Sequence, residues 1–90
     1  SGITGMTRSM AVELASSNIL VNCISPGFVM TDLTRSSLSS IEIEELSAKV
    51  PMKRFAEPAE IARTAIFLTS EENTYLTGQN IIVDGGFTNV

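Results

Sequence analysis

An apolar segment that ends in a proline–glycine turn constrains the fold of this chain more than any other feature. Residues 19–31 read Ile-Leu-Val-Asn-Cys-Ile-Ser-Pro-Gly-Phe-Val-Met-Thr. The first part lacks a clean apolar–polar alternation, so we predict a strand over Ile19–Ile24 that is buried on both faces of a sheet. Pro26 has no amide hydrogen and ends the ladder, whereas Gly27 lets the main chain approach a ligand closely. Ligands bind beyond the carboxyl ends of strands in open α/β sheets, which makes this turn a candidate site.

Helix-forming segments surround two strand-like runs. Apolar residues recur at helical spacing in the first segment, at Ile3, Met6, Met10 and Leu14. Asn18 suits the left-handed position that ends such a helix. We predict further helices near residues 40–49 and 58–69, and a second buried strand at 81–83. Strands that alternate with helices favour a parallel sheet with right-handed crossovers, so the fold class is α/β.

Two helix starts are marked by particular residues. Ser39 and Glu42 have the spacing of a capping box, in which each side chain bonds to the other residue's backbone amide. Pro58 occupies the first helical position that proline prefers. Glu42, Glu44 and Glu45 are more simply explained as a solvated helix face than as an acid/base cluster, because acidic side chains are favourable near a helix N-terminus.

Composition and charge argue against several classes of function. Ninety residues form at most one small domain. The net charge of −4 and the lack of a basic block argue against nucleic-acid binding. One cysteine and no histidine exclude a disulfide framework and the usual zinc spacings within this segment, so we expect no metal site. No apolar run approaches the roughly 18–20 residues of a membrane span. Ser1 already lies in a helical pattern, and we expect the chain to be a piece of a longer protein.

Three pairs of motifs follow one another in a fixed order. Val21-Asn22 precedes Ser25-Pro26-Gly27, Pro51-x-Lys53-Arg54-Phe55 precedes Glu57-Pro58-x-Glu60-Ile61-Ala62, and Thr77-Gly78-Gln79 precedes Val83-Asp84-Gly85-Gly86. Each motif is weak singly, but the ordered set resembles the short-chain dehydrogenase/reductase family, closest in style to 3-oxoacyl-carrier-protein reductases. The resemblance implies a C-terminal fragment of a Rossmann-type doubly wound parallel sheet. Residues 1–90 would then be the C-terminal part of a single dinucleotide-binding domain, with no separate second domain.

The same resemblance implies roles for the loop after the first strand. Pro26, Gly27, Val29 and Thr31 would contact an NAD or NADP cofactor, with main chain holding the nicotinamide carboxamide and the threonine binding the carboxamide or pyrophosphate. Phe28, Met30 and Leu33 would begin a lid over a small-molecule substrate that continues through residues 40–49. The alternative for Thr31 is an ordinary loop residue or a helix cap.

Two positions depart from the family pattern, in which glycine usually stands at the place of Asn18 and a basic residue often stands at the place of Leu20. Both lie away from the expected cofactor contacts.

The family's catalytic residues are not expected within this chain. The glycine-rich fingerprint, the catalytic serine and the Tyr-x-x-x-Lys pair precede this region in the family, so we expect no catalytic residue in 1–90 and an inactive isolated chain. Tyr75 lies in the stretch that leads into the last strand, and we do not expect it to be a catalytic acid. Ser25 has no histidine partner in the chain, which argues against a serine hydrolase. Cys23 lies inside the predicted strand, where a packed thiol is the simpler explanation.

Three functional hypotheses follow. In the first, the chain is part of an NAD(P)-dependent oxidoreductase that transfers hydride between nicotinamide and a carbonyl or hydroxyl substrate, such as a 3-oxoacyl thioester, a sugar or a ketone. In the second, it is a non-catalytic relative that acts in binding or oligomer assembly. In the third, it is an autonomous α/β module, against which two strands without neighbours argue. The resemblance also implies a cytoplasmic homo-oligomer, a tetramer or a dimer.

Overall fold

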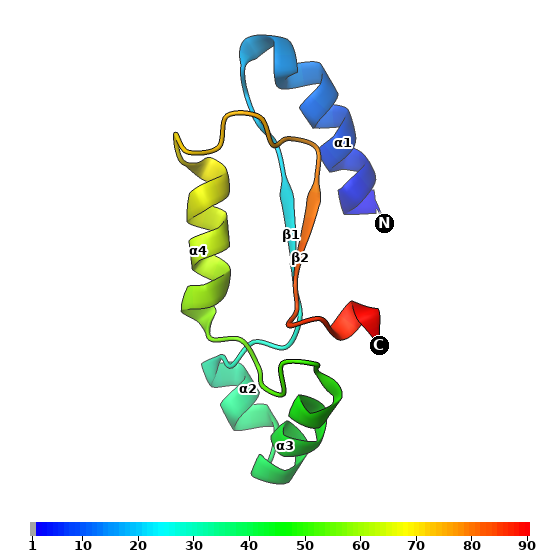
Figure 1. Ribbon diagram of the computed structural model, residues 1–90, viewed down its shortest axis with the longest axis vertical. Helices are drawn as coiled ribbons and strands as arrows, with labels where there is room; N and C mark the ends of the chain where they lie inside the picture. The colour runs from blue at the N-terminus through cyan, green and yellow to red at the C-terminus, as the bar shows by residue number, and fades with distance from the viewer. Residues whose placement is uncertain (1) are drawn as a thin grey trace. The chain divides into compact units, whose positions relative to one another are not determined.

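The structure is a computed structural model that describes residues 2–90. In chain order its elements are α1 (Gly2–Leu14), η1 (Ala15–Ser17), β1 (Cys23–Pro26), α2 (Asp32–Ser37), α3 (Ser40–Lys49), α4 (Pro58–Thr69), β2 (Asn80–Val83) and η2 (Phe87–Asn89) (Figure 1). The chain divides into two compact units. The first unit comprises Ser1–Ser25 and Arg63–Ile81, and the second comprises Pro26–Ala62 and Ile82–Val90.

β1 and β2 are hydrogen-bonded neighbours in a parallel pair. In the first unit, the Cys23 amide donates to the Gln79 carbonyl at 2.8 Å. In the second unit, the Gly27 amide donates to the Val83 carbonyl at 3.0 Å. Residue numbers rise together along the two strands, as parallel pairing requires. The predicted α/β fold with a parallel sheet is therefore confirmed.

The first strand begins later than the sequence pattern predicts. The apolar run suggests Ile19–Ile24, but the ladder covers Cys23–Pro26. The reason lies in a side chain, because the Val21 amide donates to the Thr77 hydroxyl at 2.9 Å instead of to a neighbouring strand. Residues of β1 are half-buried or exposed rather than buried on both faces, since the described sheet has only two strands.

Two asparagine side chains hold the first unit's loops together. Asn73 is 7% exposed, and its amide group donates to the carbonyls of Leu68 and Leu76 while accepting from the Leu76 amide. Asn22 donates to the Leu76 carbonyl at 2.8 Å and accepts from the Gln79 amide at 3.1 Å. The motifs around residues 21–22 and 77–79 therefore occur together because they bond to each other.

Helix α1 forms as predicted but buries a different face. Thr7 and Ala11 are its buried residues, and the Ala11 methyl lies 3.2 Å from the place a Cβ on Gly78 would occupy. Most of the predicted apolar stripe is exposed within the described chain, with 62% of Ile3 and 58% of Met6 accessible, whereas Leu14 at its end is half-buried. Small side chains allow close packing at residues 7 and 11, whereas the larger side chains of Ile3, Met6 and Met10 stay accessible in the described chain.

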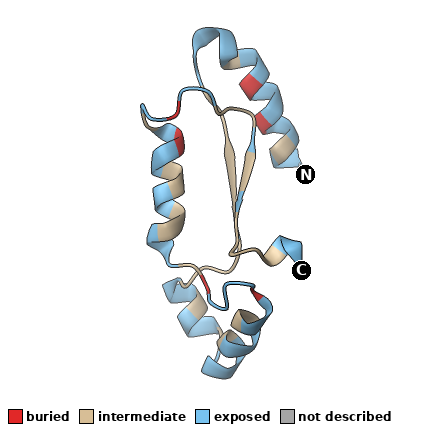
Figure 2. Cartoon of the chain, viewed as in Figure 1, coloured by how far each residue is buried: buried red, intermediate tan, exposed pale blue. Residues whose placement is uncertain are grey.

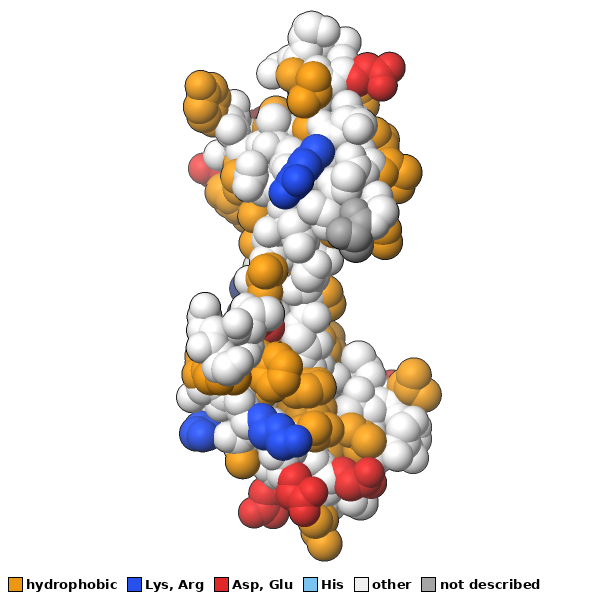
Figure 3. Space-filling model, turned by 90° about the vertical axis from the view of Figure 1, so that its right-hand side faces the viewer, with side chains coloured by type: hydrophobic (Ala, Val, Ile, Leu, Met, Phe, Trp, Pro, Cys, Tyr) orange, Lys and Arg blue, Asp and Glu red, His pale blue; other side chains and the backbone are white. Residues whose placement is uncertain are grey.

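The second unit contains α2, α3 and the first part of α4. Val50 and Phe55 are its buried apolar residues (Figure 2). The capping box at Ser39 and Glu42 is present, as is the helix start at Pro58. The acidic side chains of α3 are exposed, which confirms a solvated face, and Figure 3 shows acidic groups gathered at the end where α3 lies. None of the described helices is long and apolar enough to cross a membrane.

Candidate functional site

The loop that leaves β1 is held in an extended register by the segment before α4. Val29 and Ala56 form an isolated parallel bridge. The Ala56 amide donates to the Phe28 carbonyl at 2.9 Å, and the Met30 amide donates to the Ala56 carbonyl at 2.8 Å. In a parallel bridge, the amide and carbonyl of the central residue point to the opposite edge. The backbone polar groups of Val29 therefore face away from Ala56.

Thr31 is the N-cap of α2, so the helix-cap alternative is correct as a structural statement. Its hydroxyl oxygen accepts from the Thr34 amide at 3.1 Å. The two hydroxyl oxygens lie 3.0 Å apart, and the Thr34 hydroxyl donates to the Val29 carbonyl at 3.0 Å. Thr31 is exposed and Thr34 is half-buried. Capping uses one lone pair of the Thr31 oxygen, and the second is available to a ligand when the Thr34 hydroxyl donates to Val29 and not to Thr31.

The donor and acceptor groups of this loop fit a primary carboxamide. The Val29 amide has no hydrogen-bond partner among the described residues, so it offers a donor. Thr31 offers an acceptor, its second lone pair, as well as the capping contact. A nicotinamide carboxamide carries one carbonyl oxygen and one NH₂ group, which is the reverse pattern. The residues predicted to hold this part of a nicotinamide cofactor are therefore chemically suited to it.

Gly27 is required for a contact within the protein. A Cβ at this position would lie 2.8 Å from the Cβ and 2.9 Å from the Cα of Asp84. Because the Cα belongs to the main chain, a flexible side chain cannot relieve the clash. The close approach expected for Gly27 is therefore observed against Asp84, and its contact with a cofactor stays a prediction. Pro26, the last residue of β1, is exposed.

Asp84 closes the turn after β2 with its carboxylate. The carboxylate accepts from the amides of Gly86 at 2.9 Å and Thr88 at 3.0 Å. Desolvation raises the pKa of Asp84, but the hydrogen bonds from Thr88, Gly86 and Phe87 together outweigh it and hold the pKa below its ordinary value of 3.8. A depressed pKa in the folded state means that the ionised carboxylate stabilises the turn.

This depressed pKa predicts an acid-sensitive contribution to stability. The contribution is present above the unfolded pKa, near 3.8, and is lost as the pH falls through the lower folded value. As the pH is lowered from about 5 to about 2, we expect the thermal midpoint of the unaltered chain to fall more steeply than that of Asp84→Asn, because asparagine does not titrate. Thermal melts of the two proteins across this range measure the difference, and parallel curves would contradict the role of Asp84.

The predicted lid residues lie in different surroundings. The Phe28 ring stacks on Phe55 with centroids 5.1 Å apart and meets Phe87 edge-on at 5.3 Å. Met30 is half-buried, and Leu33 is 74% exposed on α2. Phe28 therefore packs inside the second unit, while Leu33 is available to a ligand. The lid role of these three residues stays a prediction.

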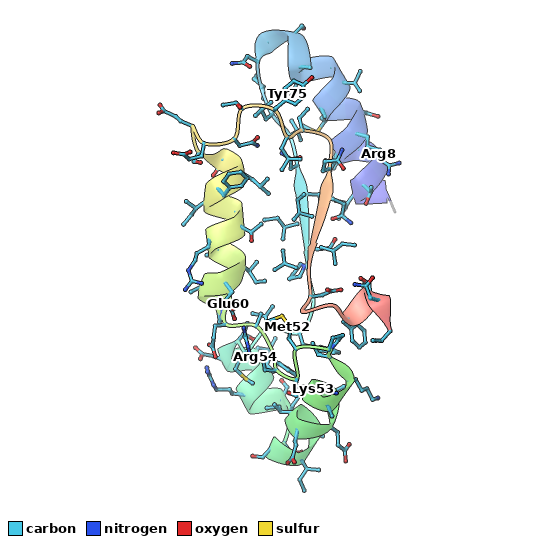
Figure 4. The ribbon with its side chains drawn as sticks, in the orientation of Figure 1. Arg8, Met52, Lys53, Arg54, Glu60 and Tyr75 are labelled. Atoms are coloured by element: carbon cyan, nitrogen blue, oxygen red, sulfur yellow. The ribbon has the colours of Figure 1, made fainter. Side chains whose placement is uncertain are left out.

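The cavity next to this loop is small. It has a volume of about 90 Å³, and Phe28, Met52, Glu60 and Asp84 are among its lining residues. Ligand pockets usually measure roughly 300–1,000 Å³, so this cavity does not by itself hold a cofactor or a substrate. Arg54 and Glu60 form a bidentate ion pair beside it, at 2.6 and 2.9 Å (Figure 4). The hydrogen bond with Glu60 raises the pKa of Arg54. Each of the two side chains therefore has the other as its partner.

Sequence reasoning missed α2 and the roles of Thr34 and Phe55. The signal for α2 was present in Thr31-Asp32, a good N-cap residue followed by an acid in the first turn. Asp32 also pairs with Arg35 at 3.5 Å across exposed helix surface. No sequence signal identified Thr34 or Phe55, because their roles depend on contacts with Val29 and Phe28.

Comparison with known proteins gives consistent matches along the chain. The family model described as "Enoyl-(Acyl carrier protein) reductase" matches residues 1–88. The 3-oxoacyl-[acyl-carrier-protein] reductase FabG of Chlamydia trachomatis is 46% identical over 85 residues, which cover 94% of this chain and 34% of that enzyme. The chain thus spans about a third of the length of the curated relatives it matches.

Solved structures show the same fold. A short-chain dehydrogenase family protein from Francisella tularensis matches with a TM-score of 0.88 and 34% identity, over 99% of this chain and 41% of that one. The structure described as "ElxO with NADP Bound" matches with a TM-score of 0.85 and 28% identity, over 98% of this chain and 36% of that one. With the ordered motifs and the parallel strands, these matches show that the chain belongs to the short-chain dehydrogenase/reductase family.

Proposed function

We propose that this chain is part of an NAD(P)-dependent oxidoreductase and supplies the loop that binds the nicotinamide carboxamide. The observation that carries the proposal is a Val29 amide without a partner among the described residues, together with the Thr31 hydroxyl as an acceptor, on a loop that follows a parallel strand. Ligands of open α/β sheets bind at this end of the strands. The similar solved structure of ElxO is described with NADP bound, which supports the choice of cofactor.

The loop would orient the cofactor by its carboxamide. Two hydrogen bonds of opposite polarity fix both the position and the rotation of the amide plane, and with it the nicotinamide ring. When bound, the cofactor would supply or take up hydride, and the main chain of Val29 and the hydroxyl of Thr31 would hold its carboxamide. Holding two reactants in a fixed geometry removes much of the entropic cost of their reaction.

The substrate proposed is a carbonyl or hydroxyl compound, with a 3-oxoacyl thioester as the first candidate. The relative from Chlamydia trachomatis is named for that reaction, and its 46% sequence identity to this chain over 85 residues supports the choice. Leu33 on α2 and Ile41 on α3 are exposed apolar side chains of the proposed lid region. Such side chains would exclude water from the reacting atoms when a substrate with an apolar chain binds.

A homo-oligomer is proposed on similar grounds. Helix α4 exposes 65% of Ile66 and 48% of Phe67, two adjacent large apolar side chains that could contribute to a subunit contact. Contiguous exposed apolar patches are typical of protein–protein contacts, which supports α4 as the face to test. A second possible function, binding or assembly without catalysis, uses the same surface and is separated from catalysis by the following experiment.

A hybrid enzyme tests the proposed function. In the hybrid, these 90 residues replace the matching third of the 3-oxoacyl-carrier-protein reductase of Chlamydia trachomatis. We expect the hybrid to bind NADH or NADPH, measured by calorimetry, and to reduce a 3-oxoacyl thioester. The isolated chain is expected to oxidise neither cofactor, because the family's catalytic residues are not expected in it.

Two results would contradict parts of the proposal. A hybrid that melts cooperatively but binds neither NADH nor NADPH would contradict the cofactor loop. A hybrid that binds cofactor but reduces no carbonyl substrate, while the unaltered Chlamydia trachomatis enzyme does, would favour the non-catalytic alternative.

A further inference from the structure

Thr34 joins the two parts of the loop that would face the carboxamide. Its hydroxyl donates to the Val29 carbonyl at 3.0 Å, and its amide donates to the Thr31 hydroxyl oxygen at 3.1 Å. The hydroxyl oxygens of Thr31 and Thr34 lie 3.0 Å apart. Thr34 is half-buried, whereas Thr31 is exposed. The half-buried Thr34 hydroxyl is therefore positioned to orient the exposed Thr31 hydroxyl.

The direction of these hydrogen bonds follows from counting hydrogens. Each threonine hydroxyl has one hydrogen. A carbonyl cannot donate, so the Thr34 hydrogen is used in the bond to Val29. By distance alone either oxygen could donate in the contact between the two hydroxyl groups. Both contacts of Thr34 are hydrogen bonds at once only when this contact uses the hydrogen of Thr31. With its hydrogen directed at Thr34, Thr31 presents only a lone pair to a ligand.

This polarity is complementary to an amide and not to a carboxylate. The Val29 amide and carbonyl share the edge of the loop that faces away from Ala56, and Thr34 is bonded to that carbonyl. A carboxamide places its oxygen against the Val29 donor and its NH₂ against the Thr31 acceptor. A carboxylate has only acceptors, so one of its oxygens would face the Thr31 lone pair.

We propose that Thr34 is a positioning residue that holds the Thr31 hydroxyl as a hydrogen-bond acceptor, so that the loop selects a nicotinamide carboxamide over a nicotinic-acid carboxylate. The proposal rests on the proposed function and adds to it the chemical basis of a specificity. Thr34 acts through Thr31 and through the Val29 carbonyl, and it need not touch the cofactor.

The test compares the dissociation constants of two dinucleotides that differ only in this group. The hybrid enzyme is titrated by calorimetry with the nicotinamide dinucleotide that it binds more tightly, NAD⁺ or NADP⁺, and with the matching nicotinic-acid dinucleotide. We expect the parent to favour the amide by roughly five- to a hundredfold, the range for one hydrogen bond left unmade. Thr34→Val and Thr34→Ala free the Thr31 hydrogen to donate, so this preference should fall about fivefold or more.

Thr34→Ser is the matched control, because it keeps the hydroxyl group and should keep the preference within about twofold of the parent. A merely structural Thr34 would weaken both dinucleotides equally, so an unchanged preference in Thr34→Val and Thr34→Ala would overturn the inference while leaving the cofactor loop intact. A parent hybrid that binds neither dinucleotide would instead overturn the proposed function, and this inference with it.

Discussion

Replacing Phe55 with alanine is expected to lower the free energy of unfolding of the hybrid enzyme by about 3–5 kcal/mol. Phe55 is 6% exposed, and its ring stacks on Phe28 at a centroid distance of 5.1 Å. The substitution removes a buried ring and leaves a cavity that the second unit can fill only by moving. Phe28 directly follows Gly27, so the loss should also loosen the cofactor loop and weaken binding of NAD(P)H.

Two further variants control this prediction, and chemical denaturation monitored by circular dichroism measures all three. Phe55→Leu keeps most of the apolar volume and loses the ring stacking, so a loss below about 1.5 kcal/mol is expected. Ile41→Ala removes a side chain that is 68% exposed, and its effect should stay within about 0.5 kcal/mol. If Phe55→Ala lowers the free energy of unfolding no more than Ile41→Ala does, the contact between Phe28 and Phe55 does not stabilise the loop.

Local signals in the sequence were sufficient to predict two helices almost to the residue. Helix α3 follows Ser39, whose capping box with Glu42 satisfies two backbone amides that a helix start leaves unpaired. Helix α4 begins at Pro58, where a missing amide hydrogen has no cost. Asn18 adopts the predicted left-handed conformation with φ of 57°. Each of these features depends on neighbours within a few residues, which a sequence displays directly.

Features set by distant residues could not be predicted in the same way. The late start of β1 depends on Thr77, whose hydroxyl accepts a hydrogen bond from the Val21 amide although the two residues are more than fifty positions apart. The buried face of α1 carries Thr7 and Ala11, of which Ala11 lies against Gly78, and not the largest apolar side chains. Apolar spacing identifies a helix, but it does not show which face finds a partner.

The candidate site was predicted in outline, and its chemistry required the structure. The loop and its residue Thr31 followed from the strand, the turn and the family resemblance. The bridge to Ala56 turns the Val29 amide outward. The register of that bridge depends on the main chain, so the side chains in the sequence do not predict it. Gly27 was identified as a position of close approach, yet the observed neighbour is Asp84.

Replacing Thr31 with valine is expected to weaken cofactor binding by the hybrid roughly five- to a hundredfold, because a hydrogen bond lost at a desolvated site costs about 1–3 kcal/mol. Valine keeps the shape of threonine and removes the hydroxyl. The variant also loses the N-cap of α2, for which about 1 kcal/mol of stability is typical. Thr31→Ser keeps both functions of the hydroxyl and should bind cofactor nearly as the parent does.

Ser39→Ala separates the two effects, since Ser39 caps α3 in the same way without belonging to the loop. It should lose a similar amount of stability and leave cofactor binding unchanged. The most direct test of the cofactor loop is therefore the dissociation constant of NAD(P)H for the parent hybrid, Thr31→Val and Ser39→Ala. We predict that the constant rises at least about fivefold in Thr31→Val alone; a value within about twofold of the parent, below the effect expected of a lost hydrogen bond, would contradict the assignment of this loop to the cofactor.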